Sequence, residues 1–71
     1  MTTEKDINFF LDNIEKFREQ HTGHYVLIKD GKLCAVYIDV KAVEANARKH
    51  GKPLIFYIGE DGYEEYTLID S

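Results

Sequence analysis

The chain has little of what usually stabilises a small protein or carries out its chemistry. Its 71 residues include one cysteine, one proline, one serine and no tryptophan. A single cysteine cannot form an intrachain disulfide. The only serine, Ser71, is the last residue, where an ordered serine nucleophile is not expected. Cys34 lies in an apolar run, so we predict an inert buried thiol rather than a cysteine nucleophile.

Positive charge is scarce and unevenly placed. The formal net charge is −4, which argues against nucleic-acid binding because phosphate neutralisation supplies most of that affinity. Four of the nine basic residues gather in one segment, at Lys41, Arg48, Lys49 and Lys52, and none follows Pro53. Such a division suits two solvated faces, and it also suits docking on another copy or on a partner.

Long hydrophobic runs are absent as well. No segment approaches the roughly 20 apolar residues of a membrane span, and the acidic N-terminal segment does not resemble a signal peptide. With the lone thiol, these features predict a cytoplasmic protein with no membrane partner.

No pattern in the sequence predicts a metal or cofactor site. His21 and His24 supply at most two of the three or four ligands that zinc needs. Gly51-Lys52 lacks the upstream glycine and the following Ser or Thr of a phosphate-binding loop. The paired carboxylates Glu60-Asp61 and Glu64-Glu65 have no predicted pocket to raise a pKa. We therefore expect no cofactor, no metal and no enzymatic activity.

The strongest positive signal is Asp30-Gly31, placed between the apolar runs 25–29 and 32–38. Two-residue hairpin turns of type I′ need a positive φ at both central positions, which Asp-Gly provides. With this turn as the centre, strict pairing places Ile28 opposite Leu33 and Tyr25 opposite Val36. Both faces of the hairpin are then apolar, so the second face needs a cover.

The remaining elements follow from periodicity and from turn residues. Helices are predicted over residues 4–20 and 40–50, the second capped by Asp39, and strands over 54–58 and 63–69. The first helix carries one apolar stripe at helical spacing, formed by Ile7, Phe10, Leu11, Ile14 and Phe17. The prediction is a single α+β domain over residues 1–71, a two-layer sandwich of order α-β-β-α-β-β. Its four-stranded, mostly antiparallel sheet carries both helices on one face. Pairing of the first strand with the third, or of the second with the third, stays open.

Part of the chain resembles a known family. The segments that carry the resemblance are Gly23-His24-Tyr25-Val-Leu-Ile, Asp30-Gly31-Lys32-Leu, and Leu54-Ile-Phe-Tyr-Ile58 after a short helix. They resemble a family of small prokaryotic proteins classed only as a domain of unknown function, over about residues 17–58. The resemblance implies no activity, ligand or catalytic residue.

An interaction surface is the function class that these features favour. A 71-residue core without disulfide or metal is expected to contribute only about 3–5 kcal/mol, and one hairpin face lacks an obvious helix. We therefore predict a non-enzymatic interaction or adaptor domain that forms a homodimer and possibly binds one further protein. The expected interface residues are Phe9, Tyr25, Leu27, Val36, Ile38, Tyr57 and Tyr66.

The acidic turn is the second expected surface. It is left free for a partner and comprises Glu60, Asp61, Glu64 and Glu65. The alternative function is a phage-type inhibitor or decoy, an anti-defence protein that binds a host protein or sequesters a small ligand. A composite enzyme site between subunits and nucleic-acid binding by the segment from Lys41 to Lys52 are further alternatives.

Overall fold

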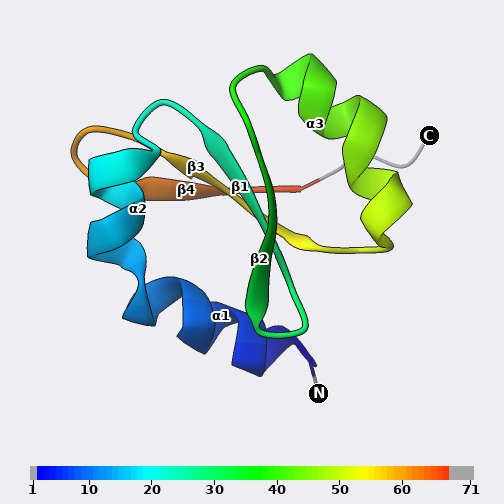
Figure 1. The fold of residues 1–71 in the computed structure, drawn as a ribbon, viewed down its shortest axis with the longest axis horizontal. Helices are drawn as coiled ribbons and strands as arrows, with labels where there is room; N and C mark the ends of the chain where they lie inside the picture. Colours follow the sequence, from blue (N-terminus) through cyan, green and yellow to red (C-terminus); the bar gives the residue numbers. More distant parts are fainter. Residues whose placement is uncertain (1, 68–71) are drawn as a thin grey trace.

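A four-stranded antiparallel sheet with helices on both sides forms the structure, a computed structural model that describes residues 2–67 (Figure 1). The strand order is β2-β1-β3-β4, so β1 pairs with β3 and the open question of strand order is settled. The α+β class and the element order are confirmed. The elements are α1 (Thr2–Asp12), α2 (Ile14–Gln20), β1 (Tyr25–Lys29), β2 (Lys32–Tyr37), α3 (Val40–Asn46), the 3-10 helix η1 (Ala47–His50), β3 (Leu54–Ile58) and β4 (Tyr63–Tyr66).

The placement of both helical segments on one face is wrong. Alternate residues of β1 enter two separate cores: Val26 packs with Phe10 of α1, and Leu27 packs with Val43 of α3. Successive strand side chains point to opposite faces, so α1 and α2 cover one face and α3 with η1 covers the other (Figure 1). The molecule has three layers instead of two because β1 is apolar on both faces.

The hairpin turn forms as predicted, but the register changes within the hairpin. Asp30 has φ 57° and Gly31 has φ 73°, as a type I′ turn requires. Ile28 pairs with Leu33, after which a bulge at Cys34 brings Ala35 opposite Leu27. An extra residue in one strand moves every later side chain to the other face. The predicted pairing beyond Leu33 is therefore wrong.

The first helical segment is bent at Asn13, where a single helix over residues 4–20 was predicted. The Asn13 side chain donates a 2.9 Å hydrogen bond to the Phe9 carbonyl. Its backbone N–H bonds to the Phe10 carbonyl, three residues back, at 3.1 Å. A tightened turn with a competing side-chain bond bends a helix, and the bend lets Phe10 and Phe17 enter the same core.

The second helical segment and the last two strands lie close to their predicted positions. Asp39 accepts a 3.0 Å hydrogen bond from the Lys41 N–H and so caps α3. After β3, the chain turns through Gly59 and Gly62, whose backbone groups are joined by a 2.7 Å hydrogen bond. The end of the predicted strand 63–69 lies outside the described residues.

Asp6 ties α1 to the hairpin turn. Its side chain is only 4% exposed, and Oδ1 accepts a 2.7 Å hydrogen bond from the Gly31 N–H. The carboxylate thus satisfies a part-buried backbone donor of the turn. This bond joins residues 25 positions apart and sets how α1 lies across the sheet.

Removing the carboxylate of Asp6 should destabilise the fold. Asp6→Ala leaves the Gly31 amide without its acceptor, and we expect the free energy of unfolding to fall by about 1–3 kcal/mol. Asp6→Asn keeps an acceptor oxygen and should lose less. Urea unfolding followed by circular dichroism measures both. Equal losses for the two variants would contradict the hydrogen bond as the cause.

Candidate functional site

The expected hairpin interface is not one surface. Leu27 is fully buried beneath α3, and Val36 packs on the opposite face against the α1 core. The bulge at Cys34 separates them, because it reverses the side of the sheet on which Val36 lies. Ile38 is 74% exposed but follows the end of β2. The second apolar face that motivated the interface is covered by α3, so this part of the prediction is wrong.

The three predicted interface tyrosines do come together. Tyr25 has its ring centroid 4.9 Å from that of Tyr57 and 5.8 Å from that of Tyr66. All three are half-buried on the face that α3 covers. The Tyr66 hydroxyl donates a 3.0 Å hydrogen bond to the Glu44 carboxylate of α3. Loss of solvent and this bond to Glu44 raise the pKa of Tyr66 above 10.0.

The pKa of Tyr66 gives a test of the link between β4 and α3. The pKa of Tyr66 is raised in the folded state by loss of solvent first and by Glu44 second, so the neutral hydroxyl and its bond to Glu44 stabilise the fold below pH 10, and this contribution is lost as pH rises through the folded value. We expect Glu44→Gln to lower the pKa of Tyr66 towards 10.0. Tyrosinate absorbance, taken as the difference between each protein and its Tyr66→Phe counterpart, measures it. An unchanged pKa would contradict the link to Glu44.

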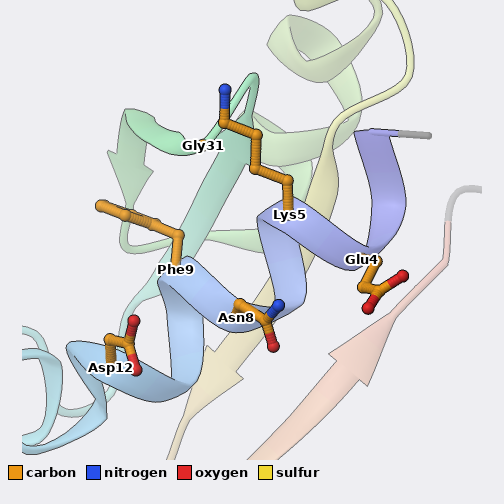
Figure 2. Close-up of a pocket in the computed structure, with 6 residues that line it drawn as sticks. All are labelled: Glu4, Lys5, Asn8, Phe9, Asp12 and Gly31. Atoms are coloured by element: carbon orange, nitrogen blue, oxygen red, sulfur yellow. The ribbon is translucent and has the colours of Figure 1, made fainter.

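Phe9 occupies a different place from the other predicted residues. It is half-buried against the α1 core and lines an open pocket of about 530 Å³ beside the hairpin turn. The other lining residues are Glu4, Lys5, Asn8, Asp12 and Gly31. Figure 2 shows these side chains spreading outward from α1, with Lys5 reaching over Gly31 and the two carboxylates pointing apart. The pocket therefore brings no set of polar groups to one point.

The acidic turn is exposed throughout. Glu60, Asp61, Glu64 and Glu65 all face solvent, as a partner-facing surface would need. Asp61 and Glu64 line a hollow of about 330 Å³ together with the rings of Tyr57 and Tyr63. The turn is held in place from α2, because the Arg18 guanidinium donates a 3.1 Å hydrogen bond to the Glu60 carbonyl.

Strand β4 follows this turn and forms one edge of the sheet. Within residues 2–67 it pairs with β3 alone, so the backbone groups on its outer side have no strand partner. Its side chains alternate between the faces. Tyr63 and Glu65 lie on the face of α1, where the Tyr63 ring sits 4.8 Å from that of Phe10, and Glu64 and Tyr66 lie on the face of α3.

Exposed apolar side chains gather beside β4. Tyr63 is 45% exposed, and on α1 Ile7 is 38% and Leu11 46% exposed. Helical spacing places Ile7 and Leu11 on the flank of α1 opposite Lys5 and Phe9. Lys5 and Phe9 lie at the hairpin turn, whereas the strand order puts β4 at the other side of the sheet. Ile7 and Leu11 therefore face the β4 side.

These residues define a candidate binding surface, called here the edge surface: Ile7, Leu11, Tyr63, Glu64, Glu65 and Tyr66. The sequence predicted the two glutamates and Tyr66, and it assigned Ile7 and Leu11 to the core stripe of the first helix. In the structure, the buried side of α1 is centred on Asp6 and Phe10. The width of the stripe, which extends well to one side of Phe10, is the signal that could have shown Ile7 and Leu11 to be marginal.

The remaining candidate groups do not assemble into a site. Cys34 is half-buried at the bulge and lies in neither core, so the expected core thiol is wrong in this respect. The rings of His21 and His24 are 6.2 Å apart. No three His, Cys, Asp or Glu residues among those described are placed to hold a metal ion. Within residues 2–67, no helix has the length and apolar character needed to cross a membrane.

Comparison with known proteins finds no relative. No family model matches the chain, and no curated protein and no solved structure is significantly similar to it. The resemblance of residues 17–58 to a family of unknown function therefore stays a prediction. Arguments about function rest on the geometry of the edge surface.

Proposed function

We propose that the protein is a non-enzymatic interaction domain that binds another protein through the edge surface. One feature carries the proposal: of the four large hydrophobic side chains that the described part of the chain exposes, Tyr63 belongs to the edge strand β4, and helical spacing places Ile7 and Leu11 on the flank of α1 that faces the β4 side. Exposed apolar groups that gather at one place are typical of binding surfaces. Tyrosine at the centre of such a surface is an enriched contact residue.

The charge distribution supports the same surface. The acidic turn lies at one end of the molecule, and η1, with Arg48 and Lys49, lies at the other (Figure 1). Separated charges orient an approaching partner and raise the rate of encounter. A partner with a basic contact region is therefore expected at the edge surface.

Self-association, which the sequence predicts, would have to use a surface other than the hairpin face. Two copies could pair β4 with β4 about a two-fold axis. Antiparallel pairing centred on this strand would place Glu64 opposite Glu64 of the other copy, or Glu65 opposite Glu65, and like charges directly opposite are destabilising. We therefore propose that the partner is a different protein.

An inhibitor or decoy, such as a phage-type anti-defence protein, is the second candidate function. The exposed acidic turn favours it, because a row of carboxylates suits a basic surface on a host factor. Such an inhibitor would use the same edge surface and would bind one defined target tightly. Recovery of a single host protein, as opposed to several, distinguishes it from a general adaptor.

Affinity capture with matched variants tests the proposed function. The edge variant combines Leu11→Glu with Tyr63→Ala, and the control variant, Lys49→Glu, changes an exposed residue at the opposite end. We expect the wild type and the control to recover the same protein and the edge variant to lose it. Equal recovery by the edge variant, with its fold intact by circular dichroism, would contradict the proposal.

A further inference from the structure

We infer that β4 accepts a fifth strand from its partner, an extended segment with the pattern apolar-basic-basic-apolar. The inference rests on the proposed function and specifies the chemistry of the partner. Its basis is the edge strand itself. Within residues 2–67 no strand pairs with the outer side of β4, so its backbone donors and acceptors are open to a further strand, and strand addition to such an edge is a recurrent way of binding peptides.

The pattern of the partner follows from the pattern of β4. In a sheet, residues opposite each other on neighbouring strands share a face and are in contact. Partner residues opposite Tyr63 and Tyr66 would therefore meet aromatic rings, and those opposite Glu64 and Glu65 would meet exposed carboxylates. Apolar or aromatic side chains complement the rings, and Lys or Arg complements the carboxylates.

The order of residues in β4 makes the pattern independent of strand direction. Tyr63-Glu64-Glu65-Tyr66 is the same sequence in both directions, so one partner motif fits a parallel or an antiparallel addition. The two glutamates lie on opposite faces of the sheet, and each therefore needs its own basic residue. A cluster of basic side chains on one face, as a helix would present, matches only one of them.

The surroundings of β4 limit the length of the basic part. At the Tyr66 end, Lys52 lines a pocket together with Glu65 and Tyr66, so a further basic residue there would face a like charge. Along the α1 side, Ile7 and Leu11 offer apolar surface to residues that flank the motif. The complementary segment is thus two basic residues between apolar ones and not a long polybasic run.

Synthetic peptides with blocked ends test the inference against the intact protein. The probe contains Tyr-Lys-Lys-Tyr, and its matched control, Lys-Tyr-Tyr-Lys, has the same composition with the charges moved away from the glutamates. We expect the probe to bind at least about tenfold more tightly than the control. N-methylation of one alternating set of its amides should abolish binding, and methylation of the other set should preserve it.

Protein variants complete the test. Glu64→Lys with Glu65→Lys should weaken binding of the probe by about tenfold or more. Glu15→Lys with Glu19→Lys makes the same charge change on exposed positions of α2 and should leave the affinity within about twofold. Equal effects of the two double variants, or equal binding of the two peptides, would overturn strand addition, because non-specific charge attraction would explain both.

Failure of the inference and failure of the proposed function give different results. If no peptide binds, strand addition is overturned. The proposed function then still holds if the edge variant with Leu11→Glu and Tyr63→Ala loses the captured protein. If that variant retains the protein, both proposals fail.

Discussion

Phe10→Ala is expected to lower the free energy of unfolding by about 3–5 kcal/mol. Phe10 is completely buried, and its ring stacks on Phe56 with centroids 3.8 Å apart. It also contacts Phe17 and Tyr63, at 5.7 and 4.8 Å. A single truncation therefore leaves a cavity between α1 and three other aromatic rings. Because the whole core is expected to contribute only about 3–5 kcal/mol, the variant should be largely unfolded.

The neighbouring residue provides the control for Phe10. Leu11→Ala truncates a smaller apolar side chain that is 46% exposed, and we expect a loss below about 1 kcal/mol. Urea unfolding measures both, and Phe10→Leu supplies a folded variant if Phe10→Ala has no cooperative transition. A loss for Leu11→Ala as large as that for Phe10→Leu would mean that α1 is rotated about its axis, which would remove Leu11 from the edge surface.

Val43→Asp should have an effect of similar size on the other face of the sheet. Val43 is fully buried with Leu27, Ala47 and Ile55, and a carboxylate there has no partner, so we expect a loss of about 3–5 kcal/mol or more. Lys41→Asp introduces the same side chain on an exposed position near the start of α3. It should change stability by less than about 0.5 kcal/mol.

The outcome for Val43 also decides whether the second face of the hairpin is available for self-association. If Val43→Asp is as stable as Lys41→Asp in thermal melts, α3 does not cover the second face of the hairpin. That face would then be free for another copy, as the sequence alone predicted. A large loss of stability, independent of protein concentration, supports a monomer with two covered faces.

Local signals in the sequence predicted the elements well because each depends on the conformation of one or two residues. Asp30-Gly31 needs positive φ at both positions, and Asp39 supplies a cap that few other residues could replace. The bulge at Cys34 could not be predicted in this way. It depends on which side chains of β2 fit beneath α1 and α3, and no local preference of Cys34 encodes that choice.

Local patterns also could not predict which elements cover the two faces of the sheet. An apolar strand such as β1 shows that both faces are buried, but not whether a helix or a second copy covers each face. Val43 and Ala47 have small side chains, which were compatible with cover of that face by α3 or by a second copy. Of the candidate site, the acidic turn was predictable from composition. The contribution of Ile7 and Leu11 was predictable only in part: the width of the apolar stripe marks them as marginal, but the orientation of α1, in which Asp6 bonds to the hairpin turn, has no local signal.

Mapping of backbone amide chemical shifts on addition of the Tyr-Lys-Lys-Tyr peptide tests most directly whether the protein works through its β4 edge. The account predicts that the largest changes fall on residues 63–66 and on Ile7 and Leu11, and that β4 amides exchange more slowly with solvent when the peptide is bound. Changes confined to β2, at the opposite edge of the sheet, or to Tyr25 and Tyr57 beneath α3 would contradict it.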